Sequence, residues 1–556
     1  MRTMPGAASL CASLPRIAAK PSIPAILELF PGSRNAPNGH TLALVPTGGG
    51  RVKPLPPASG FARGRGGLLR TWLADSAYQW LAVLEHELLL FAAVWFAIGA
   101  ADELVMDGIW LWQRLTGAGP TGQLAGNGRD KLSSMAAVFV PAWRESAVIG
   151  PMVAHCLAVW PQEDLRIYVG CYRNDQETLN ALTIVSEDPR VRVVVHDRDG
   201  PTTKADCLNR LYLAMRQDER RSGQRIGFIV LHDAEDMVHP AALALMDRAL
   251  DTVDFVQLPV RPEPQASSPW VAGHYCDEFA EAHARDMVVR DHIGAGLPSA
   301  GVGCAFSRAA IERIVAVRGG ALPFAADCLT EDYEAGMLVA ETGGRSRFIR
   351  VRDARGELVA TREFFPDGLA ASVRQKTRWV HGIAFQGWDR LGWNRSAGDL
   401  WMRLRDRRGP LVALVLLAAY LALPLWPIVR FGEMAGFVVP VPPGPVLKGL
   451  LAFNLCSLIW RLVVRALFTG SEYGWIEGVR SVFRFPVGNI IAIMAARRAA
   501  VAYVRVLFGG ALTWDHTLHC AHPVQAGVGL ASHASSTQRP RRPASSGLVP
   551  AALVGN

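Results

Sequence analysis

Three stretches of the chain are apolar over the length of a membrane span. Residues 80–101, 410–429 and 449–468 carry few charges, and about 20 residues of helix cross the hydrocarbon of a bilayer. The first stretch is interrupted by charged residues at 85–87. The third carries two arginines in its C-terminal half, where they can reach the interface. The pattern predicts three membrane-spanning helices.

Two further stretches are expected to lie in the membrane interface. Residues 105–115 place two tryptophans beside Arg114, which is typical of an interfacial aromatic belt; the alternative is a buried amphipathic helix of a soluble domain. Residues 485–508 are apolar but are broken by adjacent arginines at 497 and 498. Paired arginines favour a helix that lies on the cytosolic interface over one that crosses the bilayer.

The region 130–395 has a different pattern, in which short β-branched runs alternate with segments of mixed polarity. This alternation is typical of an α/β fold in which helices cover a parallel sheet. The runs are almost continuously apolar, as strands buried on both faces require. The predicted strands are 136–140, 165–170, 191–196, 227–232 and 254–260.

The two ends of the chain show neither the 3.6-residue period of a helix nor the two-residue period of a strand. Residues 1–75 are rich in proline, glycine and alanine, and 521–556 contain the basic run STQRPRRPASS. Such compositions favour disorder. The sequence therefore predicts a disordered leader at 1–75, a membrane anchor with its interfacial segment at 76–118, an α/β domain at 130–395, membrane and interface helices at 405–520, and a disordered basic tail at 521–556.

The composition favours a membrane protein over a nucleic-acid-binding one. Half of the 556 residues (50%) are hydrophobic, 19% are charged, and the formal net charge is +9. In so apolar a chain, basic residues usually flank membrane segments on the cytoplasmic side. The nine cysteines form no C-x-x-C pair, so neither a disulfide framework nor a zinc knuckle is indicated, and a cytosol-facing domain is expected.

The sequence HDAEDMVHP at 232–240 directly follows a predicted strand. Side chains at the carboxyl end of a parallel strand project into the crevice where α/β proteins bind ligands. Asp233 and Glu235, flanked by Asp236, are hard oxygen donors suited to Mg²⁺ or Mn²⁺. An acidic loop alone is more often a solvated turn, so the surrounding motifs decide its meaning.

Polar loops follow the other predicted strands in a recognisable order. They are VPAWRE (140–145), GCYRND (170–175), GPTTKADCLN (200–209), and later LTEDYE (329–334) and RQKTRWVHG (374–382). With the acidic loop, this set resembles family 2 glycosyltransferases of the GT-A fold. The family pattern is P-x-x-N-E, an acid after strand two, K-A-x-x-L-N, D-x-D, T-E-D and Q-x-x-R-W.

The chain departs from this family pattern at two positions. Arg144 stands where the family has asparagine, and the D-x-D element is D-x-E through Asp233 and Glu235, which keeps two carboxylates; Asp236 is an alternative to Glu235. Within the family the chain is most similar to the membrane-anchored bacterial phage-adsorption-protein-B type. HDAED, the single N-terminal anchor with its aromatic stretch, and LTWDHTLH (512–519) carry that similarity. Proteins of that type often have a further C-terminal domain, which this chain is expected to lack.

The resemblance implies a donor site for a sugar nucleotide, whose diphosphate needs cationic partners. For Asp175 the alternative is an Asx-turn that closes a strand loop. The residues implied are Glu145 and Asp175 at the nucleoside end, Lys204 and Arg378 at the diphosphate, and Asp233 and Glu235 as ligands of Mg²⁺ or Mn²⁺.

The resemblance also implies a catalytic base and an acceptor cleft. Asp332 is the candidate base for the acceptor hydroxyl and Glu331 the weaker one; the alternative is a helix N-terminus capped by Thr330. An indole offers a flat face to a sugar, and the alternative for Trp379 is packing in the core. Glycines let the acceptor approach the backbone, and the alternative for them is an ordinary turn. The acceptor residues implied are Gln375, Trp379, Gly301 and Gly303.

The sequence therefore predicts a multi-pass glycosyltransferase of the bacterial inner membrane with a cytosolic GT-A domain. It would move a sugar from a UDP-sugar to a growing surface or exported polysaccharide, with inversion in a single displacement. The expected partners are the nucleotide sugar, the polysaccharide and the lipid bilayer, with an outer-membrane export partner left open and no nucleic acid. The alternative is a catalytically idle membrane receptor or scaffold for phage adsorption or exopolysaccharide secretion.

The predicted topology contains a conflict. A single anchor before a cytosolic domain requires an external N-terminus, whereas the arginines of the leader favour an internal one. Either the leader is not translated, or a second entry of residues 105–115 into the bilayer resolves the conflict.

Overall fold

The computed structural model describes residues 64–117, 121–124, 131–320, 322–393, 396–439, 442–510 and 521–527. The segment LTWDHTLH, most of the expected leader, and the chain beyond 527 lie outside the described residues. The chain divides into Met1–Leu68 and a compact unit at Leu69–Asn556, which contains every strand and the candidate site.

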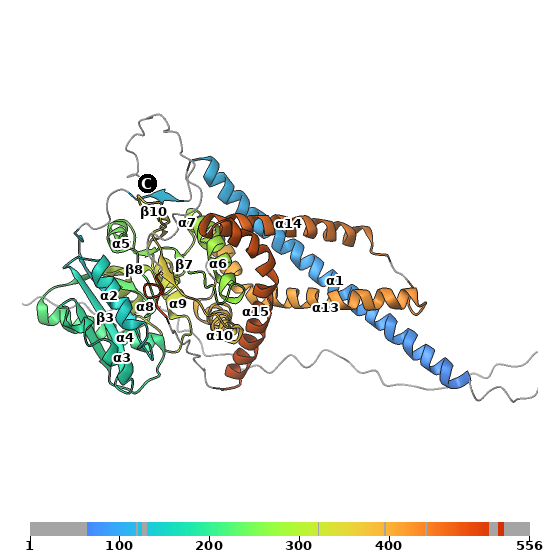
Figure 1. Ribbon diagram of the computed structural model, residues 1–556, viewed down its shortest axis with the longest axis horizontal. Helices are drawn as coiled ribbons and strands as arrows, with labels where there is room; N and C mark the ends of the chain where they lie inside the picture. Colours follow the sequence, from blue (N-terminus) through green and yellow to red (C-terminus); the bar gives the residue numbers. More distant parts are fainter. Residues whose placement is uncertain are drawn as a thin grey trace, which may run out of the picture. The chain divides into compact units, whose positions relative to one another are not determined.

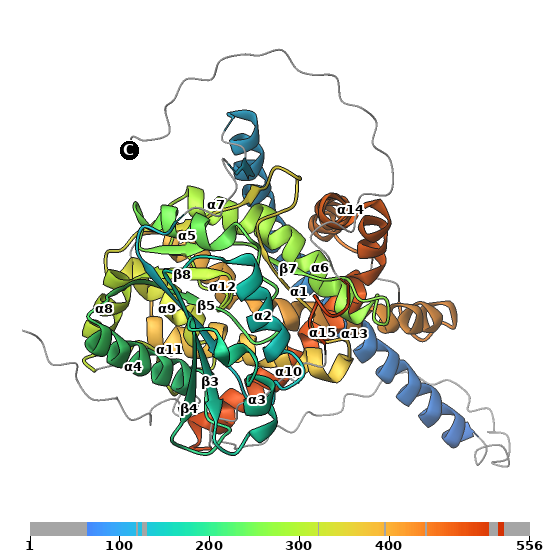
Figure 2. The same cartoon turned by 60° about the vertical axis from the view of Figure 1, so that its left-hand side comes forward.

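A seven-stranded sheet forms the centre of the α/β domain (Figures 1 and 2). The strand order is β4-β3-β2-β5-β8-β6-β9, and β8 runs antiparallel to both of its neighbours. Because β2 pairs in parallel with β3 and β5, the carboxyl ends of these strands meet at one edge. The strands are β2 (Met135–Pro141), β3 (Leu165–Tyr172), β4 (Val191–His196), β5 (Ile226–Leu231), β6 (Phe255–Gln257), β8 (Cys304–Ser307) and β9 (Ser346–Phe348).

Alternate residues of the central strands supply two hydrophobic cores, one on each face of the sheet. In β2, Val138 packs on one face with Met152 of α2, whereas Phe139 packs on the other with Leu208 of α4. This is the period-two alternation of a strand buried on both sides. The helices of the α/β domain are α2 (Ile149–Val159), α3 (Gln176–Ala181), η1 (Val185–Glu187), α4 (Lys204–Ser222), α5 (Ala242–Leu250), α6 (Val271–Glu281), η2 (Ala282–Asp286), α7 (Met287–His292), α8 (Arg308–Val317), α9 (Glu331–Glu341), α10 (Leu369–Val380), η3 (His381–Gln386), α11 (Gly387–Leu391) and α12 (Ala397–Arg407).

Four of the five predicted strands are confirmed, and the fifth is two strands. The run 254–260 forms β6, and then β7 (Val260–Pro262) leaves the sheet and pairs with β11 (Thr361–Glu363). Pro259 lies between the two strands and has no N–H to donate, so the ladder does not continue through it. A further two-stranded sheet joins β1 (Gly122–Gln123) to β10 (Val351–Arg352).

Among the described residues, three helices are long and apolar enough to cross a membrane: α1 (Gly64–Leu115) over its part Ser76–Leu115, α13 (Gly409–Met434) and α14 (Pro445–Tyr473). α1 starts inside the range expected to be a disordered leader. α13 continues through its two internal prolines to Met434. Glu85, which interrupts the first apolar stretch, is buried and lies 3.9 Å from Arg430 of α13.

Residues 105–115 are the end of α1 and not a separate interfacial segment. Met106 is fully buried, and Trp110 Nε1 donates to the carbonyl of Ala284, 2.9 Å away, so this end of α1 packs on the α/β domain. One face of this segment packs against protein, because the acidic residues just before the tryptophans have partners on the domain, whereas Trp112 is 65% exposed. The expected interfacial belt therefore stays a prediction.

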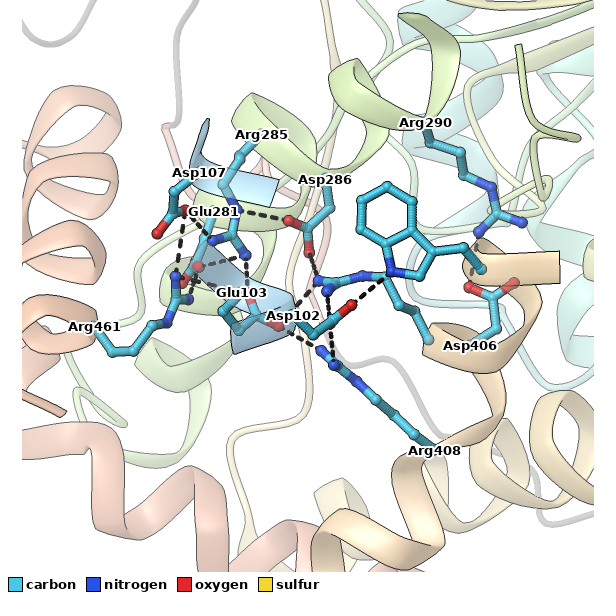
Figure 3. Close-up of polar contacts among 12 residues, drawn as sticks. Asp102, Glu103, Asp107, Glu281, Arg285, Asp286, Arg290, Asp406, Arg408 and Arg461 are labelled. Carbon is cyan, nitrogen blue, oxygen red and sulfur yellow. Dashed lines mark hydrogen bonds and ion pairs between the residues drawn. The ribbon is translucent and has the colours of Figure 1, made fainter. Parts of the chain in front are cut away.

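An ion-pair network docks this end of α1, and Figure 3 shows its acids turned toward arginines of three other elements. The acids carry several arginine contacts each, which fixes the helix more firmly than single exposed pairs do. The contacts are Trp401, Arg405 and Arg408 for Asp102, Arg285, Arg405 and Arg408 for Glu103, and Arg285, Trp460 and Arg461 for Asp107.

The last helix, α15 (Trp475–Leu507), packs against α10, α13 and α14. Arg484 is buried and pairs with Asp277 of α6 at 2.7 Å, which ties α15 to the α/β domain. Arg465 of α14, expected to reach the interface, instead lies 3.3 Å from Asp277. The segment 521–527, expected to belong to a disordered tail, forms a turn with His522 fully buried.

Candidate active site

A cavity of about 410 Å³ opens beside the carboxyl ends of β2 and β5. Among the described residues, seven carboxylic acids line it against only two side chains of permanent positive charge. This excess makes the cavity attractive to cations and unfavourable to a bare diphosphate. The acids are Glu145, Asp233, Glu235, Glu331, Asp332, Glu363 and Asp406, and the two cations are Lys204 and Arg378.

Lys204 stands at the first position of α4, directly opposite the acidic loop. Thr203 caps this helix, its hydroxyl accepting the Asp206 N–H at 3.2 Å. The Lys204 ammonium lies 2.6 Å from Oδ1 of Asp233. Burial acts to lower the pKa of Lys204, but the carboxylates of Asp233, Asp332 and Glu331 raise it above its usual value. Lys204 is therefore a fixed positive charge among these acids.

Asp233 and Glu235 both line the cavity, whereas Asp236 does not face it. Asp236 is fully buried; its Oδ2 lies 2.6 Å from Nδ1 of His232 and accepts the Asp233 N–H at 3.0 Å. The structure thus disfavours Asp236 as a substitute for Glu235. Asp236 instead holds the loop in place, with the core residue His232 as its hydrogen-bonding partner.

Glu331 and Asp332 open α9 at the cavity wall, where Glu331 is buried and Asp332 is half-buried. Thr330 makes no side-chain cap to the helix, so the capping alternative does not account for this motif. Burial raises the pKa of Glu331 to about 7, an effect that Asp332 strengthens and Lys204 opposes. Burial also raises the pKa of Asp332. Oε1 of Glu331 has no hydrogen-bond partner in the described part of the chain.

α10 brings Gln375, Arg378 and Trp379 to the opposite wall. Oε1 of Gln375 is buried and, within the described ranges, unpartnered. Trp379 is half-buried against Tyr275 and Phe365, with ring centroids 6.2 and 6.4 Å away. Its indole therefore both packs in a small aromatic core and lines the cavity, so the two interpretations of Trp379 are compatible.

The two residues expected at the nucleoside end lie differently. Glu145 is buried at the cavity, and its N–H donates to Thr178 Oγ1 at 3.0 Å. Asp175 is the N-cap of α3, accepting the N–H groups of Thr178 at 3.4 Å and Arg144 at 2.6 Å. Asp175 is outside the cavity lining defined by the described residues, so its contacts match the turn-closing alternative.

Gly301 and Gly303 have positive φ angles of 78° and 58°. A Cβ on Gly301 would lie 2.2 Å from Oδ2 of Asp332, and one on Gly303 would lie 2.3 Å from Oγ1 of Thr361. The two glycines therefore leave space for the side chains of Asp332 and Thr361. Their neighbours Ala300 and Val302 face the cavity.

Several cavity residues, Asp406 among them, were missed by the sequence analysis. Glu363, at the end of β11, is buried beside the acidic loop, and burial together with Asp236 and Glu235 raises its pKa well above the usual range. Trp143 and Tyr172 meet edge to face at 5.2 Å and offer aromatic surface at the β2 and β3 ends. Both aromatic residues stand inside motifs that were already singled out, whereas nothing in the sequence around Glu363 marks it.

The donor set fits a hard divalent cation only together with ligand oxygens. Among the described residues no group of three or more His, Cys, Asp or Glu side chains is placed to hold a metal ion by itself. Asp233 and Glu235 supply carboxylate oxygens on one loop, and Mg²⁺ or Mn²⁺ commonly completes such a pair with phosphate oxygens. The carboxylate-rich lining is compatible with such a cation.

Comparison with known proteins gives a family match for residues 134–382, to the family described as Glycosyltransferase like family 2. Bacteriophage adsorption protein B of Escherichia coli (strain K12) is 32% identical over 495 residues, which are 81% of this chain and 64% of the relative. Bacteriophage N4 adsorption protein B of Escherichia coli O157:H7 gives the same values. The chain thus spans about 64% of the length of the curated relatives it matches.

Solved structures with a similar chain course include two sugar transferases. A mannosyltransferase from Pyrobaculum calidifontis, in complex with GDP-Man and Mn²⁺, is 18% identical with a TM-score of 0.44, covering 72% of this chain and 99% of its own. Glucosyl-3-phosphoglycerate synthase from Mycobacterium tuberculosis, with Mn²⁺, UDP-glucose and phosphoglyceric acid, is 15% identical with a TM-score of 0.26, covering 42% of this chain and 73% of its own.

Proposed function

Because this chain belongs through residues 134–382 to glycosyltransferase family 2, we propose that it transfers a sugar from a nucleoside-diphosphate sugar, most simply a UDP-sugar, to a growing surface or exported polysaccharide. The reaction is a single displacement with inversion. The observation that carries the proposal is the meeting of Lys204, Asp233, Glu331, Asp332 and Arg378 in one cavity, although four separate segments supply them.

Different residues of the cavity bind the donor and accept the proton of the acceptor hydroxyl. Lys204 and Arg378 bind the donor diphosphate, and the aromatic surface of Trp143 and Tyr172 receives the base. The acceptor hydroxyl gives its proton to Asp332 while its oxygen attacks the anomeric carbon and the bond from that carbon to the diphosphate oxygen breaks. Attack from the face opposite the leaving group inverts the anomeric configuration.

Asp233 and Glu235 are the residues that would hold Mg²⁺ or Mn²⁺. A divalent cation there would stabilise the negative charge that develops on the leaving diphosphate. Lys204, already 2.6 Å from Asp233, adds a positive charge at the same end of the cavity. The partly buried position of these groups strengthens each of these interactions relative to water.

The proposed location is the bacterial inner membrane, with the α/β domain in the cytosol where nucleotide sugars are made. α1 ends on the domain, α13 starts beside it at Gly409, and Tyr473 at the end of α14 donates to the carbonyl of Pro262 at 2.8 Å. All three helices therefore have one end at the domain, which is what three spans with an external start of α1 require. A second entry of residues 105–115 into the bilayer is not needed.

α15 lies beneath the acceptor side of the cavity, because it packs along α10, which carries Gln375 and Trp379. An arginine at the centre of a span costs about 2.5–3.5 kcal/mol on insertion scales, so the exposed Arg497 and Arg498 favour the cytosolic interface for this helix. A growing chain would leave the cavity along this side, toward α13 and α14.

Cysteine labelling tests this topology. In a chain with Cys11, Cys456 and Cys520 replaced by serine, Arg497→Cys is expected to react with a membrane-impermeant maleimide only in inverted vesicles. Val439→Cys, in the exposed turn between α13 and α14, should react only in intact spheroplasts. Labelling of position 497 from the outside would contradict the cytosolic placement of α15.

The function itself is tested by a donor screen. Purified full-length protein is incubated with a panel of UDP-, GDP- and other nucleotide sugars and a polysaccharide acceptor, and release of the nucleoside diphosphate is followed. One donor, expected to be UDP-linked, should support turnover. The rival function, an idle membrane receptor, is favoured by the names of the curated relatives and predicts no release with any donor. A scaffold, however, has no need to bury the unpartnered Glu331 and Gln375 oxygens, which cost folding energy.

A further inference from the structure

The C-terminal segment 521–527 is folded against the back of the acidic loop, on the side away from the cavity. His522 is fully buried, and its Nε2 lies 3.0 Å from the carbonyl oxygen of Asp236. His522 and Asp236 are 286 positions apart in the sequence. The contact therefore joins the far end of the chain to the loop that follows β5.

Both ring nitrogens of His522 have a partner, and together they define its protonation. Nδ1 accepts the Val524 N–H at 3.2 Å, so Nε2 must carry the hydrogen that it donates to the Asp236 carbonyl. Burial lowers the pKa of this imidazole, which keeps it in the neutral form. His522 is thus a bridge between its own turn and the loop, rather than a side chain that only fills space.

The loop is held at three consecutive residues, each by a different element. Asp236 is held by His522. Met237 exchanges backbone hydrogen bonds with Arg362, at 2.8 and 3.0 Å, and the Val238 carbonyl lies 2.9 Å from Nε2 of His155. Of these three contacts, the one to Asp236 is made from outside the α/β domain.

The contact to Asp236 reaches the cavity through one residue. The Asp236 carboxylate accepts the Asp233 N–H at 3.0 Å. A shift of Asp236 therefore moves the backbone from which the Asp233 side chain projects. Asp233 and Glu235 then face the cavity. Residues that orient a ligand-bearing loop commonly change metal affinity or activity by about 10- to 100-fold when they are replaced.

We propose that His522 is a positioning residue of the active site: by hydrogen bonding to Asp236, the docked segment 521–527 fixes the loop that carries Asp233 and Glu235. The structural part of the proposal stands on the contacts of the loop, and its effect on turnover rests on the proposed function. The C-terminal segment is accordingly part of the site, although it lies far from the α/β domain in sequence.

Two amide substitutions separate positioning from general stability. In His522→Gln the side-chain amide nitrogen reaches the place of Nε2 and keeps a donor for the Asp236 carbonyl. In His522→Asn the amide is one carbon shorter and loses that bond, although it stays polar. His292→Ala, at an exposed histidine of α7, serves as the control.

Hydrogen–deuterium exchange on the full-length protein is the first readout. His522→Asn is expected to raise exchange in peptides covering 232–238 while leaving β2 and α4 unchanged, and His522→Gln and His292→Ala should match the wild type. Equal exchange in the Asn and Gln variants, or a rise spread over the whole domain, would overturn the proposal.

Binding of Mn²⁺, measured by the loss of its free electron-spin-resonance signal in the presence of UDP, is the second readout. The Asn variant is expected to need about 10- to 100-fold more Mn²⁺ for half-saturation, with the Gln variant close to the wild type. Identical Mn²⁺ binding by both variants would contradict the positioning role. If the wild-type protein transferred no sugar, the proposed function would fail, yet the exchange pattern would still decide whether His522 holds the loop.

Discussion

Replacing Asp233 with alanine is expected to lower the rate of sugar transfer by at least about 100-fold, the scale of removing one preorganised charge from a transition state. The carboxylate sits on a loop at the end of β5, partly open to the cavity, and it pairs with Lys204. The substitution removes one of the two proposed metal oxygens and leaves the sheet intact. The initial rate of UDP release, with Mn²⁺ in excess, measures the loss.

The matched control for this substitution is Asp197→Ala. Asp197 also follows a strand of the sheet, but its side chain is 75% exposed and lies outside the cavity lining. Its variant should keep wild-type turnover. An Asp233→Ala protein that is folded, membrane-bound and still active would remove Asp233 from the reaction.

Asp332→Asn is expected to lower turnover by about 10²- to 10⁴-fold while leaving the affinity for the donor unchanged, because an amide of the same shape cannot accept the acceptor proton. Asp332 is half-buried at the cavity wall, in the space that Gly301 leaves for it. Donor binding by calorimetry and turnover by UDP release are measured on the same preparation.

Glu331→Gln is the companion variant and should be milder, because Glu331 is expected to hydrogen bond to the acceptor rather than to take its proton. If donor affinity fell together with turnover in Asp332→Asn, Asp332 would belong to the donor site. If Glu331→Gln were the more damaging of the two, the base would be Glu331, whose pKa is raised to about 7 by burial.

The α/β core was predictable because strands buried on both faces have a simple sequence pattern. β2, β3, β4 and β5 each coincide with a continuous apolar run, and parallel pairing follows from their connections through helices. The short strands β7 and β11 were not predictable, since a strand of three residues is too short to show a periodicity. The packing of residues 105–115 was not predictable, because it depends on ion pairs between acids of α1 and arginines more than a hundred positions away.

The site was predictable where one motif supplies both a backbone turn and its side chains. Asp233, Glu235, Glu331 and Asp332 stand at strand or helix ends, and such ends converge at one edge of the sheet. Asp175 was not separable from a helix cap by sequence, because an aspartate after a strand suits both tasks. Glu363 reaches the cavity, and His522 reaches the loop behind it, only through long-range packing, which no local pattern encodes.

If the acidic cavity is a metal-dependent sugar-transfer site, the release of UDP must stop when the metal ion is chelated. Purified protein is supplied with the UDP-sugar that the donor screen selects and with the polysaccharide acceptor, and UDP is measured before EDTA, after EDTA, and after Mn²⁺ is restored. For a metal-dependent site, turnover is expected to stop with EDTA and to return with Mn²⁺. Turnover that continues undiminished in EDTA, or that is absent throughout, would contradict it.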